Sequence, residues 1–264
     1  MSLENFLENL AIKVRVKALE LLGAWRIKNN IISEDVGSKI DLELEEMIIN
    51  EIKEAYKDFT FIGEETGKHV HGSGKPIFIV DPLDGSTNAY RGYPIYSTSI
   101  AIATENNTEK IIGGVVMNII TGDTFKALKD QGAKLNNKTI KPSKTRKINE
   151  ALIAIDLNIR GKYHNHLKRT LPIISEAKHI RFIGTDALET CFVAAGICDA
   201  FIDLRGVLRL TDFAAACFIV KEAGGIILNE NGENLKLEFN NNTTAKYIAV
   251  SNSELAKEII NRLA

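Results

Sequence analysis

The chain has 264 residues, of which 45% are hydrophobic and 25% charged, and its 33 Lys and Arg nearly balance its 34 Asp and Glu for a formal net charge of −1. This composition is that of an ordinary globular protein and argues against a disordered, collagen-like or membrane-embedded chain. The near-zero charge also argues against binding of nucleic acid through a basic field.

The cysteines and the N-terminal segment indicate a cytoplasmic protein. Cys191, Cys198 and Cys217 are too few and too clustered for a secreted disulfide framework. Residues 1–25 space their apolar side chains as an amphipathic helix does, whereas a signal peptide needs a continuous apolar run. No stretch reaches the roughly 18 apolar residues of a membrane span, so we expect no membrane partner.

In the first half of the chain, a helix is followed by a loop, a second helix and a series of strands. Residues 28–39 are polar and predict the loop, and apolar residues spaced between 44 and 52 predict the second helix. Short β-rich runs separated by Gly, Asn and Pro then predict strands at 59–63, 77–80, 96–103, 111–118 and 124–128. Because these strands follow one another with short connections, we expect an antiparallel sheet.

Residues 136–150 are polar and basic without an apolar period, and we place a domain boundary there, between residues 1–140 and residues 141–264. The predicted elements beyond it are strands at 151–156, 180–183, 200–204, 225–228 and 247–250, and helices at about 163–177, 187–195, 213–223 and from 253. This alternation indicates layered α/β packing.

The segment 77–88, IFIVDPLDGSTN, combines a buried strand with a polar turn that enters a helix. Asp81 ends the strand, Pro82 cannot continue a ladder, and Asp84 stands three residues further on. The two carboxylates can converge on a hard cation, while the free N–H groups of the following helix end bind an anion such as phosphate. Taken alone, Asp84 is more typical of a helix cap, and Asp81 of a strand end, than of a metal ligand.

Two further acidic elements complete the pattern. Glu64 and Glu65 follow the strand that precedes segment 77–88, so neighbouring strands would bring Glu64 near Asp81. A solvated acidic turn is the alternative, and we expect it to hold for at least one of the two glutamates. Asp212 opens the apolar helix predicted at 213–223, and alone it would be only an N-cap.

Together these residues resemble the metal-dependent phosphatase family of inositol monophosphatase and fructose-1,6-bisphosphatase. The motifs that carry the resemblance are Gly63-Glu64-Glu65, Asp81 to Asn88, Gly184-Thr185, and Asp212 with the downstream Glu222-Ala223-Gly224-Gly225. These motifs are most similar to those of archaeal enzymes that act on both substrates. The resemblance implies an α+β fold, a layered αβαβα sandwich with an antiparallel N-terminal sheet and a C-terminal α/β half.

The resemblance also implies a function and its residues. It implies a Mg²⁺-dependent phosphoric monoester hydrolase of carbohydrate metabolism, such as gluconeogenesis, acting on fructose-1,6-bisphosphate and inositol monophosphate. Two or three Mg²⁺ ions, for which Mn²⁺ can substitute, would be held by Glu64, Asp81, Asp84, Asp212 and the carbonyl of Leu83. Ser86 and Glu64 would hold the attacking water, and the backbone N–H groups of Gly85 and Ser86 would hold the phosphate. A homodimer and sensitivity to Li⁺ are implied as well.

Lys39 and Asp41 lie where the family has a mobile loop between its first two helices. By resemblance that loop would supply a third, weakly held metal and close over the reaction. Solvated loop charges are the alternative explanation for both residues.

Four positions depart from the pattern or concern the substrate wall. Thr211 replaces a Trp that many relatives have before the last metal ligand. Arg205 replaces a Glu of the animal enzymes, and because an Arg fork suits phosphate, we hypothesise that the substrate can carry a second anionic group. Gly184, Thr185 and Asp186 would by resemblance bind the substrate, and Asp186 would meet its hydroxyls or cap its helix. Arg209 is expected to be solvated.

Two other functions stay open. The first is a phosphatase of 3′-phosphoadenosine 5′-phosphate, which shares the metal core and differs in the pocket. The second is a family member that mainly binds a protein or RNA machine and keeps the metal site as a relic. The intact set of four acidic side chains favours an enzyme, because a pure binding module does not need them.

Overall fold

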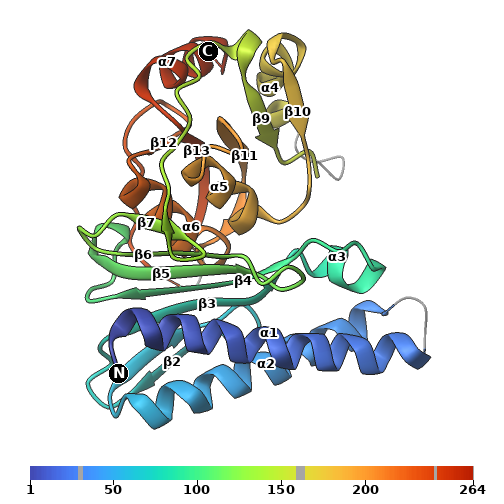
Figure 1. Cartoon of the computed structure of the whole chain (residues 1–264), viewed down its shortest axis with the longest axis vertical. Helices are drawn as coiled ribbons and strands as arrows, with labels where there is room; N and C mark the ends of the chain where they lie inside the picture. Colours follow the sequence, from blue (N-terminus) through green and yellow to red (C-terminus); the bar gives the residue numbers. More distant parts are fainter. Residues whose placement is uncertain (29–31, 159–163, 241–242, 264) are drawn as a thin grey trace.

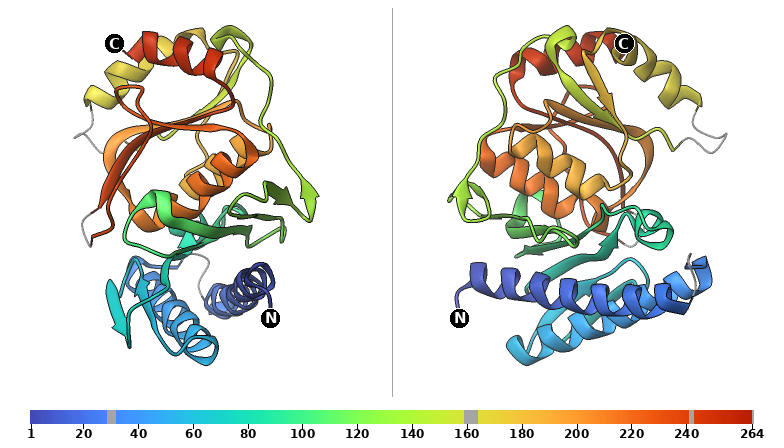
Figure 2. Two further views of the ribbon diagram at one scale, coloured as in Figure 1. Left: turned by 90° about the vertical axis from the view of Figure 1, so that its left-hand side faces the viewer. Right: turned by 45° about the vertical axis from the view of Figure 1, so that its right-hand side comes forward.

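The protein folds into five stacked layers in the order helices, sheet, helices, sheet, helices (Figures 1 and 2). This computed structural model describes residues 1–28, 32–158, 164–240 and 243–263. The α-helices are α1 (Leu3–Lys28), α2 (Glu34–Ala55), α3 (Ser86–Arg91), α4 (His164–Glu176), α5 (Asp186–Ala194), α6 (Leu210–Ala223) and α7 (Ser253–Leu263). The strands of the first sheet are β1 (Phe59–Ile62), β2 (Lys68–His71), β3 (Ile77–Asp84), β4 (Ser97–Ala103), β5 (Ile111–Asn118), β6 (Thr124–Leu128), β7 (Ala133–Leu135) and β8 (Lys138–Thr139). Those of the second sheet are β9 (Leu152–Ile155), β10 (His179–Arg181), β11 (Ala200–Arg209), β12 (Ile226–Asn229) and β13 (Thr244–Val250), and the 3₁₀ turns are Thr108–Lys110 and Ile148–Glu150. The layered αβαβα sandwich implied by the resemblance is confirmed.

Helices α1 and α2 form the outer layer below the first sheet, and α2 begins earlier than predicted. The predicted loop at 28–39 is wrong from Glu34 onward, because α2 starts there. Ile40 and Leu44 lie one turn apart and are both buried, so the apolar stripe of α2 extends back into the polar segment. Residues 29–31 of the predicted loop lie outside the described part of the chain.

The first sheet has eight strands in the order β2-β1-β3-β4-β5-β6-β7-β8. The prediction of an antiparallel sheet is wrong for one pair of strands, because β1 and β3 pair in parallel. The strand β2 lies between them in sequence, but it pairs antiparallel with the other side of β1 and forms the edge of the sheet. The strand β3 is buried along its whole length, since helices cover both faces of the sheet. It also runs to Asp84, beyond the strand end predicted at Asp81.

The second sheet has the order β10-β9-β11-β13-β12, and α5 and α6 lie between it and the first sheet. Gly114 of β5 lets α6 approach closely, because a Cβ at this position would lie 3.3 Å from the backbone of Ala215. Helices α4 and α7 cover the outer face. The predicted helix at about 163–177 is α4, whose predicted first residue, 163, lies outside the described residues.

One buried apolar cluster joins the two sheets through α5 and α6. It contains Ile79 and Phe125 from the first sheet, Phe213 from α6, and Phe201 and Tyr247 from the second sheet. Residues 1–140 and residues 141–264 therefore share one apolar core, and the domain boundary between them stays a prediction. Among the described residues, no helix is long and apolar enough to cross a membrane.

Phe213→Ala is expected to lower the free energy of unfolding by about 3–5 kcal/mol, because it opens a cavity in the shared core. Phe213 is completely buried and its ring lies 5.7 Å from that of Tyr247. Urea denaturation measures the loss. Phe182→Ala is the matched control, because Phe182 is 47% exposed, and equal losses in the two variants would contradict the assignment of the core.

Candidate active site

A cavity of about 630 Å³ lies where the end of β3 meets α5, β11 and α6. It brings together most residues that the sequence predicts for the site. The predicted residues that line it are Glu64, Asp81, Leu83, Asp84, Gly85, Ser86, Gly184, Asp186, Arg205 and Asp212. Both halves of the chain contribute, so neither half forms this cavity alone.

The strand β3 delivers two carboxylates because its ladder is interrupted near its end. Asp81 pairs with Ser99 and Asp84 pairs with Ser97, with a register irregularity between them. The Asp81 carboxylate accepts a hydrogen bond of 2.9 Å from the backbone N–H of Leu83. Asp81, Leu83 and Asp84 thereby all line the cavity from a single strand end.

The turn after β3 requires glycine. Gly85 has φ +82°, and a Cβ there would lie 3.1 Å from the carbonyl oxygen of Gly184 and 3.2 Å from Thr185. This close approach places the Gly85–Ser86 turn against the segment that precedes α5. Asn88 strengthens the contact, since its side-chain amide donates to the carbonyl of Ile183 at 2.8 Å.

Asp84 joins the two halves of the site. Its carboxylate accepts hydrogen bonds from the hydroxyl of Ser97 at 2.8 Å, from the backbone N–H of Asp186 at 3.1 Å and from the hydroxyl of Thr185. Burial raises its pKa to about 6, against the lowering effect of these donors. Thr185, predicted to bind substrate, instead supports Asp84 and does not line the cavity.

Three acidic side chains converge beside Asp84. Oxygen atoms of Glu64, Asp81 and Asp212 all lie within 4.8 Å of one another. Burial raises the pKa of each, to about 7 for Glu64, and the negative charges of their neighbours add to the rise. Such a cluster favours a bound cation, which would relieve the repulsion.

Arg209 supplies the positive charge at this cluster. Its guanidinium donates to Glu64, its Nε lies 3.7 Å from Asp212, and its backbone N–H donates to Asp212 at 2.8 Å. The expectation that Arg209 is solvated is therefore wrong in part, since half of the side chain is exposed and its head group is ion-paired. The sequence signal was its place on the strand that leads into Asp212.

Glu45 of α2 holds the segment that carries Glu64, and the sequence reasoning missed it. It is completely buried and accepts hydrogen bonds of 2.9 Å from the backbone N–H groups of Glu65 and Thr66. Glu65 itself is exposed, in line with the expectation that one member of the acidic pair is solvated.

Arg205 lies in a second acidic group on the opposite wall. Its guanidinium donates to Asp203 at 2.9 Å, and it lies 2.8 Å from Asp156 and 3.8 Å from Asp186. Burial raises the pKa of Asp186 well above its ordinary value, and the charges of Asp156, Asp84 and Asp203 add to the rise. Sequence reasoning missed Asp156 and Asp203, although Asp156 ends a predicted strand as Asp81 does.

The contacts of Arg205 do not match the predicted role of an anion fork for a second phosphate. Three carboxyl groups surround one guanidinium, so an incoming anion would meet an excess of acidic oxygens at this wall. Carboxylates instead accept hydrogen bonds from hydroxyl groups.

Lys39 and Asp41 do not lie in a loop and do not line the cavity. Both belong to α2, where Lys39 is exposed and Asp41 is half-buried with a hydrogen bond from the hydroxyl of Tyr90. Burial raises the pKa of Asp41 to about 7.

The donor set of the cluster fits a hard cation. Glu64, Asp81, Asp84 and Asp212 offer only oxygen, as Mg²⁺ prefers. Burial raises the pKa values of Glu64, Asp81 and Asp84. Keeping these side chains ionised in the folded chain therefore costs free energy unless a positive charge lies beside them. Leu83, between Asp81 and Asp84, also lines the cavity.

A layered αβαβα fold with an acidic oxygen cluster beside a Gly-Ser turn defines the class of metal-dependent phosphoric monoester hydrolases. A sequence profile described as "Inositol monophosphatase family" matches residues 7–264. The chain belongs to this family, and the resemblance inferred from the motifs is confirmed.

Similar proteins carry three different descriptions. The "Fructose-1,6-bisphosphatase/inositol-1-monophosphatase" of Methanothermobacter thermautotrophicus is 35% identical over 85% of this chain and 82% of that protein. The "Bifunctional NADP phosphatase/NAD kinase" of Methanococcus maripaludis is 33% identical over 96% of this chain and 47% of that protein. Among solved structures, the extragenic suppressor protein suhB of Bartonella henselae has a TM-score of 0.84 and 28% identity, covering 98% of this chain and 97% of that one.

Arg209→Gln is expected to enlarge the rise in melting temperature that Mg²⁺ produces. The variant removes a cation that competes for Glu64 and Asp212, so a divalent ion binds more tightly to the remaining carboxylates. Thermal unfolding with and without Mg²⁺ measures the effect. Arg181→Gln, at an exposed position outside the cavity, is the matched control. A smaller Mg²⁺ effect in Arg209→Gln than in the wild type would show that Arg209 assists the ion.

Proposed function

We propose that this protein hydrolyses the phosphate monoesters of inositol monophosphate and fructose-1,6-bisphosphate with the help of Mg²⁺. The observation that carries the proposal is the convergence of Glu64, Asp81 and Asp212 in the cavity that Asp84 and the Gly85–Ser86 turn also line. The name of the Methanothermobacter relative supports this choice of substrates.

The residues of the cluster have distinct roles in this proposal. Glu64, Asp81, Asp84, Asp212 and the carbonyl of Leu83 would hold two Mg²⁺ ions, for which Mn²⁺ could substitute. The chemistry that bound Mg²⁺ would supply is activation of a water molecule and stabilisation of the charge that develops on the phosphate. Glu64 and the hydroxyl of Ser86 orient that water, and the backbone N–H groups of Gly85 and Ser86 hold the phosphate oxygens. Phosphoryl transfer of this kind needs no covalent protein nucleophile.

The opposite wall selects the organic part of the substrate. Asp156 and Asp186 line the cavity with their oxygens near Arg205. A polyol or sugar offers hydroxyl groups that donate to these carboxyl oxygens, whereas a second phosphate would be repelled if placed there. For fructose-1,6-bisphosphate, the second phosphate therefore points away from this wall, toward the mouth of the cavity.

The remaining expectations belong to the same proposal. We infer a cytoplasmic homodimer that is sensitive to Li⁺. A third metal near Lys39 and Asp41 would require α2 to rearrange, because both residues now lie within that helix.

A second candidate function is removal of a ribose phosphate from a nucleotide. The NADP phosphatase name of the Methanococcus relative, whose match covers 96% of this chain, favours it. The 3′-phosphoadenosine 5′-phosphate phosphatase belongs to the same class. A protein or RNA-binding module would show no turnover of any of these substrates.

A substrate panel at one free Mg²⁺ concentration tests the proposal. Inositol 1-phosphate, fructose-1,6-bisphosphate, NADP and 3′-phosphoadenosine 5′-phosphate are compared by kcat/KM for phosphate release. The two sugar-type substrates are expected to exceed the nucleotides by about tenfold or more, because only they place several hydroxyls at Asp156 and Asp186. A preference for a nucleotide would replace the first proposal by the second, and no release from any substrate would favour the binding module.

Asp84→Asn is expected to abolish phosphate release while preserving the fold. The amide keeps the shape of the side chain but loses the charge that the metal needs. Release of inorganic phosphate measures activity, and circular dichroism checks the fold. Asp130→Asn is the matched control, because Asp130 is exposed and does not line the cavity. Full activity of Asp84→Asn would remove Asp84 from the catalytic residues.

A further inference from the structure

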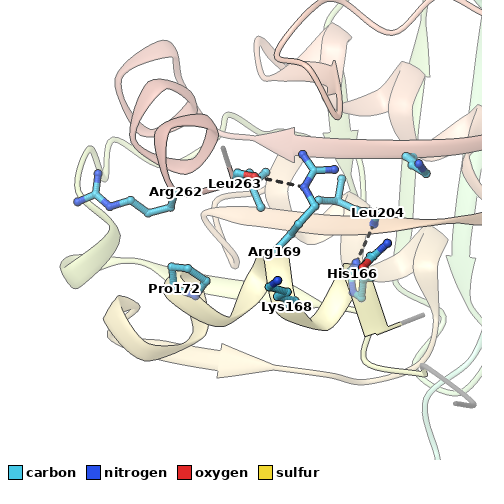
Figure 3. Close-up of a pocket in the computed structure, with 9 residues that line it drawn as sticks. His166, Lys168, Arg169, Pro172, Leu204, Arg262 and Leu263 are labelled. Carbon is cyan, nitrogen blue, oxygen red and sulfur yellow. Dashed lines mark hydrogen bonds between the residues drawn. The ribbon is translucent and has the colours of Figure 1, made fainter. Parts of the chain in front are cut away.

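A second cavity, of about 530 Å³, lies on the other side of β11 from the candidate active site. It is enclosed by α4, β11, β13 and the end of α7, and Figure 3 shows several of the side chains that form its walls. None of its lining residues belongs to the site described above. Its volume is in the range of pockets that hold small metabolites.

The charged side chains that line this cavity, which we call the basic cavity, are all positive. They are Lys168 and Arg169 of α4, Lys246 of β13 and Arg262 of α7. Lys246 pairs with Glu230 and Arg262 with Glu176, and neither glutamate lines the cavity. Within residues 1–28, 32–158, 164–240 and 243–263, no carboxylate forms an ion pair with Lys168 or Arg169. The basic cavity therefore carries an excess of positive charge.

Among the described residues, Arg169 is held in place by backbone carbonyl groups and pairs with no carboxylate. Its Nε donates to the carbonyl of Leu263 and its Nη2 to the carbonyl of Glu230, both at 3.2 Å. Figure 3 shows the side chain rising from α4 toward Leu263, with Lys168 beside it on the same helix. Carbonyl groups orient a guanidinium but do not cancel its charge, so the remaining N–H donors are available to an anion.

The walls also offer apolar surface for an organic group. Leu204 of β11, Pro172 of α4 and Leu263 of α7 lie among the basic side chains. A planar guanidinium and a nearby ammonium bind phosphate oxygens well, and a bulky apolar wall packs against a carbon skeleton. This combination fits a small organic phosphate, whose phosphate oxygens the basic side chains bind.

His166 connects the basic cavity to the active site. It is 2% exposed and lines the basic cavity, and its Nδ1 accepts a hydrogen bond of 3.2 Å from the backbone N–H of Leu204. Its Nε2 therefore carries the proton and donates to the carbonyl of Asp156 at 2.7 Å. Asp156 and Arg205, the neighbour of Leu204 in sequence, both line the active-site cavity. Because Leu204 lines the basic cavity and the adjacent Arg205 lines the active-site cavity, β11 is a shared wall of the two cavities.

We propose that the basic cavity binds a small phosphorylated metabolite as an effector, and that His166 and β11 transmit its occupancy to Asp156 and Arg205. The ligand's phosphate contacts Lys168 and Arg169, and its organic part lies against Leu204. A ligand that draws Leu204 or His166 toward itself shifts the wall that selects the substrate. Substrate binding and effector binding are then coupled, in whichever direction the displaced wall favours.

The binding step is tested on protein stripped of divalent metal on a chelating resin, with inorganic pyrophosphate as the probe. Without metal, the acidic active site repels this anion, so a signal reports the basic cavity. Isothermal titration calorimetry is expected to show one site per chain, and Lys168→Glu is expected to weaken it by about tenfold or more. Lys168 is exposed, so the variant folds, and Lys129→Glu is a control with the same change of charge at an exposed position outside both cavities. No binding by the wild type, or equal binding by Lys168→Glu, would overturn the site.

The transmission step is tested by amide hydrogen exchange on the same metal-free protein. Pyrophosphate is expected to change exchange at Leu204 and Arg205, because the Leu204 N–H is the donor to His166. Lys168→Glu is expected to show no such change at the same probe concentration. A change confined to α4 and α7 would leave a binding site without coupling and would refute the effector role. Both tests are independent of turnover, so their failure is distinct from failure of the proposed phosphatase activity.

Discussion

The buried carboxylate of Asp84 is the contact on which the geometry of the site depends. It takes one donor from Ser97 of the first sheet and two from Thr185 and Asp186 at the start of α5, which tie the end of β3 to the C-terminal half. Burying a carboxylate costs free energy unless hydrogen bonds replace its bound water, so these donors fix the position of the two halves relative to each other. The contact of Gly85 with Gly184 allows this approach, because any Cβ at Gly85 would press on the facing backbone.

On each wall of the active-site cavity an arginine balances the charge of acidic side chains, but the two arginines differ in burial. Arg205 is almost wholly buried among Asp156, Asp203 and Asp186, so its removal would leave carboxylates without compensation. Arg209 is half exposed against Glu64 and Asp212, and water or a divalent cation can take its place. The two arginines both line the active-site cavity, while Leu204 of the same strand lines the basic cavity. The strand β11 thus carries the buried Arg205 and the half-exposed Arg209 of the active-site cavity as well as Leu204 of the basic cavity.

The apolar patterns predicted most helices and strands, because burial on one face imposes a period that can be read along the chain. They failed where the partner of a segment decides its structure. The start of α2 at Glu34 depends on Ile40 and Leu44 packing beneath the sheet, and the parallel pairing of β1 with β3 depends on β2 turning back to the outer edge. Neither fact has a local signal, since polar residues tolerate both loop and helix and short connections favour antiparallel pairing.

The sequence by itself determined the family, the polar turn from Asp84 into the following helix, and the acidic residues of the cluster. It could do so because these features rest on backbone chemistry and on spacing within a few residues. Only the tertiary structure decided that Thr185 supports Asp84, that Arg205 is bound by carboxylates, that Arg209 faces Glu64, and that His166 bridges two cavities. Those pairings join residues from separate elements, and the energy of a charge or hydrogen bond depends on distance and burial in the folded chain, which spacing along the sequence does not encode.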